Sequence, residues 1–196
     1  SNPKMIKQME DNPAGRPHKV LLVDDVLITN VEERARMEHP DVIGGLRVFD
    51  NTDPRNPKFV KNVETDGAGI HRPVYDFDRK LMYSGGRKDG CNGRALLIHD
   101  MKDPRNPTLI GEGWVPGQNE AAGEEPTWDL DLVSKGGVDL HEAIPYGNYV
   151  TCAWRRGGFG MMDLTDPTKP EFMWRRNFYE THNWSPASHT FMVPKG

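Results

Sequence analysis

Several features that would assign this chain to a common functional class are missing from its sequence. No apolar run reaches about 18 residues, the length at which a membrane-spanning helix is predicted. The 25 lysines and arginines are outnumbered by 29 aspartates and glutamates, so the net charge is −4 and no basic excess indicates nucleic acid. The two cysteines, Cys91 and Cys152, lack Cys-x-x-Cys spacing, and the sequence leaves open whether they pair.

The common catalytic motifs are absent as well. The sequence has no Gly-x-Ser-x-Gly nucleophile elbow, no phosphate-binding Walker loop, no dinucleotide fingerprint and no His-Glu-x-x-His pair. Serine-nucleophile chemistry and nucleotide hydrolysis therefore lose their usual support. No stretch shows a long apolar period of 3.6 residues, which argues against leucine-rich and helical repeat folds.

What the sequence does contain is an internal repeat. The pattern Asp-x-x-Asp-Pro-x-x-Pro ends an apolar run three times, at 50–57, 100–107 and 163–170, and residues 1–8 match its second half. The corresponding prolines are spaced by 54, 50 and 63 residues, and they are Pro3, Pro57, Pro107 and Pro170. A period of this length is the signature of a repeat architecture.

Each full copy of the repeat reads as a β-hairpin. Asp-Pro lies between two short apolar runs, for example 46–50 and 58–61. Because proline presets φ and aspartate can bond its own backbone, this pair predicts a turn. Two further apolar runs precede the hairpin, as at 19–23 and 26–29. Four short strands in about 50 residues are typical of a β-propeller blade, and another all-β sandwich is the alternative.

The residues that carry the repeat resemble a known family. They are Gly45-Leu46-Arg47-Val48-Phe49-Asp50 with Asp53-Pro54-Arg55-Asn56-Pro57, and Leu96-Leu97-Ile98-His99-Asp100 with Asp103-Pro104-Arg105-Asn106-Pro107. Over nearly the whole chain, this pattern resembles the LVIVD-repeat family of β-propellers. The resemblance implies a propeller of four-stranded blades. It implies no particular activity, because the biochemical role of the members is mostly unassigned.

Residues 1–196 are expected to form a single β-propeller domain that is incomplete at both ends. A propeller needs at least about four blades to close. The chain supplies roughly three and a half, since it starts inside a turn motif and stops just after the first strand of a new repeat. We therefore expect a piece of a six- or seven-bladed propeller, or a chain that associates with others to cover open strand edges.

Four of the seven histidines fall at one phase of the repeat, at the start of the first predicted strand: His18, His71, His141 and His189. The first strand of a propeller blade is the innermost, so these imidazoles are expected to meet near the central channel. Neutral imidazole is the commonest side-chain ligand of transition metals. The phase therefore predicts a divalent metal, with iron, zinc, copper and manganese not distinguished. A ring of structural, hydrogen-bonded histidines is the alternative.

The other three histidines contribute less to the prediction of a metal site. His99 lies in a third strand and is expected on a blade face, and His39 lies in a charged insertion that reads as a solvated loop. His182 is seven residues before His189 and is a reserve ligand or a substrate contact.

The residues that follow two of the aligned histidines are Arg72 and Glu142. Side chains alternate between the two faces of a strand, so both are expected to point away from the histidines. They are therefore not predicted as metal ligands.

An insertion between residues 114 and 138 accounts for the longest repeat spacing. Long loops on a rigid scaffold tend to be functional, so Glu120, Glu124 and Glu125 are predicted to donate or accept protons and Trp128 to line a pocket. A surface excursion without chemistry is the alternative.

Two arginines at the ends of second strands, Arg87 and Arg155, are candidate contacts for an anionic group of a substrate. Solvated loop charges are the alternative.

These features support two hypotheses about function. In the first, the chain is a metal-dependent enzyme, an oxygenase, lyase or hydrolase, that acts on a small organic molecule at the histidines. In the second, it is a non-catalytic propeller scaffold or binding module whose histidines are structural. Neither hypothesis includes a nucleic acid or a membrane span.

Overall fold

The computed structural model describes residues 2–9, 15–17, 19–33, 43–67, 69–126, 128, 138–177 and 188–193. Within these residues the chain forms strands and one short 3-10 helix, η1 (Glu120–Ala122), and it contains no α-helix. No helix of the described part combines the length and the apolar character needed to cross a membrane. The prediction of an all-β chain is confirmed.

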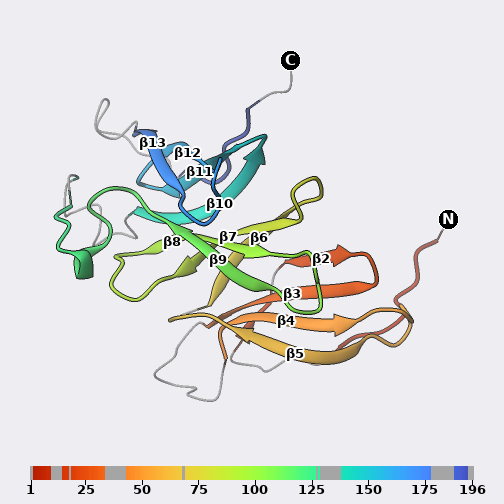
Figure 1. Ribbon diagram of the computed structural model, residues 1–196. Coiled ribbons are helices and arrows are strands. Elements are labelled where there is room, and N and C mark those ends of the chain that lie inside the picture. The colour runs from red at the N-terminus through yellow and green to blue at the C-terminus, as the bar shows by residue number, and fades with distance from the viewer. Residues whose placement is uncertain are drawn as a thin grey trace.

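The strands form three antiparallel sheets that follow one another along the chain (Figure 1). The first sheet has the order β1-β3-β4-β5 with β2 paired to β3, and contains β1 (Gly15–Arg16), β2 (Val20–Val23), β3 (Val26–Glu33), β4 (Gly45–Asp50) and β5 (Lys58–Glu64). The second sheet is β6 (Ile70–Asp76), β7 (Leu81–Arg87), β8 (Arg94–Asp100) and β9 (Thr108–Gly113). The third is β10 (Val138–Tyr146), β11 (Tyr149–Arg155), β12 (Phe159–Asp163) and β13 (Glu171–Arg176).

The second sheet lies between the other two, with β3 against β6 on one side and β10 against β6, β7 and β8 on the other (Figure 1). In the part of the chain that the structure describes, the three sheets do not close into a ring. The repeat of about 50 residues therefore corresponds to one four-stranded antiparallel unit, as the spacing of the Asp-Pro motifs predicts.

The Asp-Pro motif forms the turn between the third and fourth strand of each unit. In the first copy the backbone N–H of Thr52 donates to Asp50 Oδ1 at 2.9 Å, and that of Arg55 donates to Asp53 Oδ1 at 3.0 Å. The second and third copies repeat both bonds at Asp100, Asp103, Asp163 and Asp166. These hydrogen bonds are local, so the sequence alone is enough to specify the hairpins.

The repeats also contact one another in an equivalent way. Lys61 Nζ donates to Asn106 Oδ1 at 3.0 Å, and Lys7 Nζ donates to Asn56 Oδ1 at 2.7 Å. Each lysine lies four residues after the proline of its own copy, and each asparagine lies in the turn of the next copy. The partial copy at residues 2–9 thus contacts the first full repeat as that repeat contacts the second.

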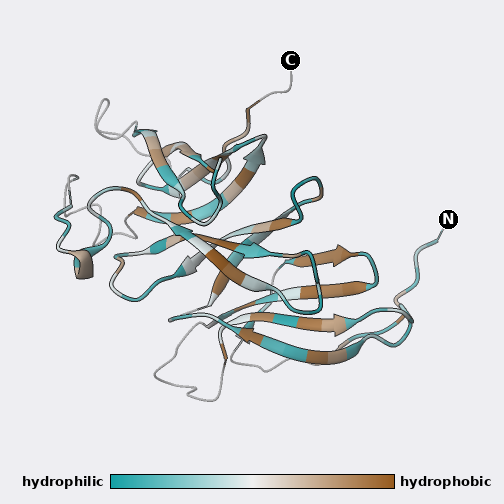
Figure 2. Ribbon diagram, in the orientation of Figure 1, coloured by the Kyte–Doolittle hydropathy of each residue, from teal (hydrophilic) through white to brown (hydrophobic). Residues whose placement is uncertain are grey.

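Apolar side chains fill the space between consecutive sheets. The hydropathy colours of Figure 2 show hydrophobic stretches along the strands. One core joins the first and second sheets through residues such as Ile28, Val48 and Leu97. The other joins the second and third sheets and includes Trp154 and Cys152. Cys91 and Cys152 are free thiols.

His99 is a buried polar residue of the first core. It pairs with Met82 across β7 and β8, and it is fully shielded from solvent beside Leu97 and Met101. Neither of its ring nitrogens has a hydrogen-bond partner among the described residues. Burial lowers the pKa of His99 to about 4, so the ring is neutral at pH 7.

We predict that His99 makes the fold sensitive to acid. The unfolded chain, with an ordinary histidine pKa, binds more protons than the folded chain between about pH 6.5 and pH 4, so the free energy of unfolding falls as the pH drops through that interval. The loss is on the order of 2–3 kcal/mol. In the third repeat the equivalent residue is Met162. His99→Met should therefore remove this loss, as measured by urea unfolding at pH 7 and pH 4.5. An unchanged difference between the two pH values would contradict the prediction.

Candidate functional site

Three of the aligned histidines contact one another where the sheets meet. His71 lies in β6, His141 in β10 and His189 in the segment 188–193. The ring centroids of His71 and His141 are 4.8 Å apart, and those of His141 and His189 are 3.7 Å apart. His71 and His141 are both buried. The fourth aligned histidine, His18, lies outside the described residues, as do His39 and His182.

A glycine allows β10 to come this close to the second sheet. Gly85 in β7 pairs with His71 in β6, and a Cβ atom at Gly85 would overlap the carbonyl oxygen of Leu140, the residue before His141. Because Gly85 has no side chain, the backbone next to His141 can lie directly against β7, the strand that pairs with β6 at His71.

A buried asparagine occupies the equivalent place between the first and second sheets. Asn30 Nδ2 donates to the carbonyl oxygen of Ile70, the residue before His71, at 2.8 Å. Asn30 Oδ1 accepts from the backbone N–H of Lys19 at 2.8 Å. One side chain thus connects β3 to the start of β6 and to the residue that follows His18.

Hydrogen bonds select the tautomer of two histidines. His71 Nδ1 lies 3.0 Å from Glu32 Oε2, and His141 Nδ1 lies 2.6 Å from the backbone oxygen of His189. An ionised carboxylate and a carbonyl only accept, so Nδ1 is the donor in both rings. In a neutral imidazole the lone pair is then on Nε2, which is the arrangement that histidine ligands adopt when a carboxylate or carbonyl holds the other nitrogen.

The surroundings also keep two of the rings uncharged. Burial lowers the pKa of His141 to about 3, and the nearby charges of His189, His71 and Arg72 act in the same direction, although the hydrogen bond to His189 opposes them. The pKa of His189 is lowered as well, first by burial and then by the positive charge of Arg72. Both imidazoles are therefore in the neutral form that binds transition metals.

The residues that follow the four aligned histidines meet at one carboxylate. Glu142 Oε1 lies 3.6 Å from Arg72 Nη1 and 3.9 Å from Lys19 Nζ, and Thr190 Oγ1 donates to Glu142 Oε2. Lys19, Arg72, Glu142 and Thr190 come directly after His18, His71, His141 and His189. Four segments separated by 53, 70 and 48 residues therefore converge here.

The strand pairing is irregular next to Arg72 and Glu142. The pairing of β6 with β7 is irregular between His71 and Val74, and the pairing of β10 with β11 is irregular between Val138 and Glu142. Arg72 has a φ of 47°, in the left-handed region. At such irregularities simple alternation does not predict the direction of a side chain.

A second set of charges links the three sheets through Glu32, the carboxylate that contacts His71. Arg94 donates to Glu32 and, through Nη1, to Asp139 Oδ2 at 2.7 Å. Arg155 Nε lies 3.3 Å from the same oxygen of Asp139. Arg155, a predicted anion contact, is thus paired with a carboxylate of the protein.

The acidic residues of the insertion have contacts outside this group. Glu124 accepts from Trp114 Nε1 at 3.0 Å and from the backbone N–H of Gly117 at 2.8 Å and of Asn119 at 3.1 Å. Burial opposes ionisation of Glu124, but these hydrogen bonds outweigh it and lower its pKa. Glu120 Oε1 accepts from Asn92 Nδ2 at 3.1 Å, and Glu125 is exposed.

The other two predicted substrate contacts lie in packed surroundings. Trp128 is buried in the core between the second and third sheets, with the guanidinium of Arg175 5.8 Å from its ring centre. The side chain of Arg87 packs over Gly67, where an added Cβ would lie 2.6 Å from Arg87 Cβ.

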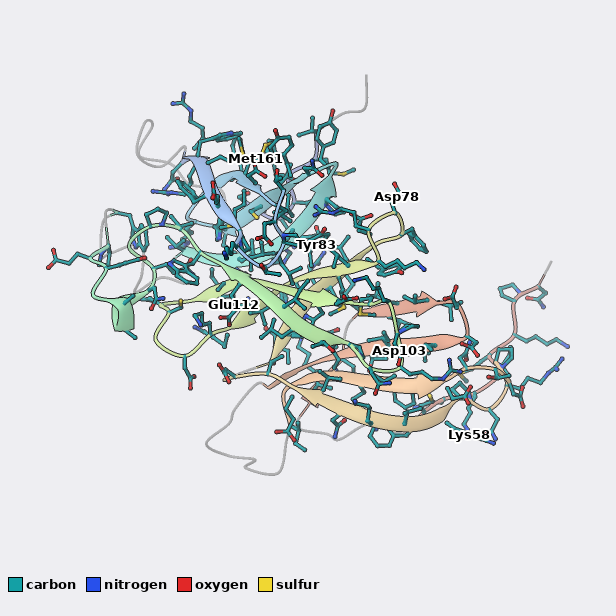
Figure 3. The ribbon with its side chains drawn as sticks, in the orientation of Figure 1. Lys58, Asp78, Tyr83, Asp103, Glu112 and Met161 are labelled. Carbon is teal, nitrogen blue, oxygen red and sulfur yellow. The ribbon has the colours of Figure 1, made fainter. Side chains whose placement is uncertain are left out.

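The described residues do not complete a metal site by themselves. Among them, no group of three or more His, Cys, Asp or Glu side chains has the arrangement of metal ligands. A pocket of about 400 Å³ lies elsewhere, between the β6–β7 and β10–β11 turns, and Asp78 marks the first of these turns in Figure 3. This pocket is beyond the end of β6, whereas His71 is near its start.

Comparisons with known proteins bear on the fold. No family model and no curated protein matches the chain. Solved structures that are similar to it include a “putative 6-phosphogluconolactonase” from Bacteroides fragilis (13% identity, TM-score 0.53) and a “hypothetical selenium-binding protein” from Sulfolobus tokodaii (12% identity, TM-score 0.51). The alignments cover 85% and 80% of this chain but only 44% and 37% of those proteins.

These two likenesses concern architecture alone. The similar structures are all-β with antiparallel four-stranded sheets, which is compatible with a β-propeller-like fold. None of the matches names the LVIVD-repeat family.

We predict that His141 remains neutral, with its proton on Nδ1, down to about pH 4, because its pKa is lowered to about 3. Long-range ¹H–¹⁵N NMR spectra distinguish the two tautomers and the imidazolium. The signals of His141 are identified by their loss in a His141→Gln variant. A titration midpoint near the ordinary histidine value would contradict the burial and contacts described for this ring.

Proposed function

We propose that the chain is part of a β-propeller of the LVIVD-repeat type, in which each sheet is one blade. The support is the three successive four-stranded units, the equivalent Lys–Asn contacts between repeats, and the convergence of the inner strands. The likeness to longer all-β structures is consistent with further blades.

One face of the first sheet supports the presence of additional blades. A cross-strand row on this face, Leu22–Leu27–Phe49–Phe59, leaves Leu22 55% and Phe59 51% exposed. In the equivalent rows of the other sheets the inner members, Met82 with His99 and Val150 with Met162, are fully buried, and Phe49 in the first row is buried too. At the outer positions, the equivalents of Leu22 are partly buried, whereas Leu109, the equivalent of Phe59 in the second sheet, is 44% exposed. The difference between the repeats is therefore greatest at Leu22, and the exposed apolar side chains of this row form a candidate association surface.

We therefore expect the isolated chain to self-associate through this row. Leu22→Lys combined with Phe59→Lys should shift the chain toward monomer without a large loss of thermal stability, because both side chains are already half exposed. Size-exclusion chromatography with light scattering across a concentration series measures the effect. Phe77→Lys, which changes an exposed phenylalanine of the β6–β7 turn, is the control. A wild-type chain that is monomeric at every concentration would refute the proposed surface.

We propose that the chain is a metal-dependent enzyme whose divalent ion is held by His71, His141 and His189 together with His18. The observation that carries this proposal is the contact among the three described rings, which come from separate repeats. Hydrogen bonds hold Nδ1 of His71 and of His141, and the low pKa values of His141 and His189 keep these two rings uncharged. A transition metal binds imidazole in its neutral form, and a hydrogen bond at the other ring nitrogen orients such a ligand.

The chemistry would be an oxygenase, lyase or hydrolase reaction on a small organic molecule. A bound iron, zinc, copper or manganese ion would supply Lewis acidity or an activated water or dioxygen. Glu32 would orient His71 through its hydrogen bond. Glu142 accepts from Thr190, the residue after His189, and is better placed to accept a proton than Glu120 or Glu124, which bond to Asn92 and Trp114. The names of the similar structures are not carried over to this chain.

A non-catalytic scaffold or binding module is the second candidate. It is favoured by the hydrogen bonds of His71 and His141, which satisfy one nitrogen of each ring within the protein. The lack of a complete ligand set among the described residues favours it too. In this case the histidines fix the junction between the sheets and the loops bind a partner.

Metal analysis separates the two functions. We expect the purified chain to bind about one divalent ion, and the double variant His71→Ala, His141→Ala to lose at least 100-fold in affinity, because removal of two ligands leaves an incomplete site. His99→Met removes a histidine outside the site and is the control. Elemental analysis after loading with zinc and removal of excess gives the stoichiometry. A folded chain that binds no ion, or equal binding by the double variant, supports the scaffold.

A further inference from the structure

The two turns that form the pocket beyond the end of β6 are both attached to one buried residue. Leu164 follows β12, and its backbone N–H donates to the carbonyl oxygen of Asn148, in one wall of the pocket, at 2.7 Å. Its own carbonyl oxygen accepts from Nη2 of Arg79, in the other wall, also at 2.7 Å. Leu164 is fully buried, so the core holds the β6–β7 and β10–β11 turns at a fixed separation. The pocket, of about 400 Å³, is therefore preformed.

The tip of the β6–β7 turn is fixed as well. Asp76 Oδ1 accepts from the backbone N–H of Asp78 at 3.0 Å and from that of Arg79 at 3.2 Å. An aspartate that bonds N–H groups further along its own turn holds the turn in one conformation. Phe77 and Asp78, the second of which is labelled in Figure 3, are therefore presented at a defined place beside the β10–β11 turn.

Three aromatic side chains line the pocket. Tyr75 and Phe77 come from the end of β6 and the turn after it, and Tyr146 comes from the end of β10. The rings of Tyr75 and Phe77 meet edge to face, with centroids 4.8 Å apart and an interplanar angle of 73°. Phe77 is nevertheless 75% exposed and Tyr146 39% exposed. Aromatic side chains that stay open to solvent around a concave site are typical of a ligand-binding surface.

The charged groups of the pocket favour a positively charged ligand. Asp76 and Asp78 contribute two carboxylates, and Arg79 is the only cation among the described residues that line the pocket. The guanidinium of Arg79 bonds the Leu164 carbonyl, and its Nη1 is shielded from solvent. A ligand in the pocket displaces water from the carboxylates, and a carboxylate that loses water without gaining a partner is unfavourable. A cation supplies that partner, whereas an anion would be repelled.

The rings select the type of cation. The face of an aromatic ring attracts positive charge, and sites with several such rings bind quaternary ammonium groups. The methyl groups of such an ion also bury apolar surface against the rings, which a strongly hydrated primary ammonium does not do. A neutral sugar can stack on the same rings, but it brings no charge to the carboxylates.

We propose that this pocket binds the quaternary ammonium group of a small organic molecule. Asp78 supplies the counter-charge, and Tyr75, Phe77 and Tyr146 contact the methyl groups of the ligand. The inference goes beyond the proposed function, because the pocket lies at the opposite end of β6 from His71 and shares no residue with the proposed metal site.

The test is an NMR titration of the ¹⁵N-labelled full chain with choline and with dimethylbutanol, its uncharged carbon analogue. Choline should bind saturably and shift the backbone signals of Phe77 and Gly147, which lie in the two walls. Dimethylbutanol should bind at least tenfold more weakly. Equal binding of the two, or an absence of saturable choline binding, would overturn the proposal. Tighter binding of glucose than of choline would also overturn it and would assign the pocket to neutral sugars.

Substitutions separate the contribution of the charge from that of the rings. Asp78→Asn removes the negative charge with little change of shape, so choline affinity should fall at least fivefold while dimethylbutanol binding stays the same. Phe77→Leu combined with Tyr146→Leu keeps an apolar wall but removes two rings, so choline affinity should fall at least tenfold. All three positions are exposed, so the melting temperature should change little. Wild-type choline affinity in either variant would refute the proposal.

A matched control accounts for the change in net charge. Asp89→Asn removes one negative charge from an exposed residue of the β7–β8 turn, outside the pocket, and should bind choline as the wild type does. A loss equal to that of Asp78→Asn would show a general effect of charge and would overturn the role of Asp78.

Removal of metal keeps this inference separate from the proposed metal site. The EDTA-treated chain should bind choline as the untreated chain does, because the histidines lie at the other end of β6. A chain that binds choline but no metal would end the metal proposal and leave this inference intact. Choline binding that disappears with the metal would place the ligand at the histidines and overturn its assignment to this pocket.

Discussion

The close approach of each inner strand to the second strand of the preceding sheet is the constraint on which the candidate site depends. At one junction Asn30 spans the gap and bonds the carbonyl before His71. At the next junction Gly85 leaves the space into which the carbonyl before His141 fits. A buried carbonyl needs a hydrogen-bond partner or close packing, so both arrangements fix the strand directly beside a histidine. If either junction were wider, the imidazoles of successive repeats would not touch.

The charges at this junction explain how neutral histidines persist among ionised groups. Glu32 and Asp139 are paired with arginines, and Glu142 lies near Lys19 and Arg72. Buried charges are tolerated when they are paired and hydrogen-bonded. The desolvation cost of these charged groups is therefore offset by their own partners and not by the imidazoles. The imidazoles are left shielded from water, and this is why proton binding to His141 is disfavoured.

The hairpins could be predicted from the sequence because local hydrogen bonds form their turns. The Asp-Pro turns form where they were predicted, because each aspartate bonds an N–H two residues further on. The positions of Arg72 and Glu142 were not accessible in this way. An irregularity of strand pairing depends on the neighbouring strands, and the simple alternation of side chains along one strand does not predict it. Glu124 was predicted as a chemical group, but the loop around it uses both of its oxygens.

The sequence by itself determined the number of repeats, their four-stranded form and the common phase of four histidines, because turn chemistry and apolar periodicity act over a few residues. Only the tertiary structure decided which side chains face one another. It buried His99 in an apolar core, left Leu22 and Phe59 of the first sheet exposed, and brought Arg72 to Glu142. These outcomes depend on contacts between segments about 50 residues apart, and packing between whole sheets, rather than the preference of any single strand, sets those contacts.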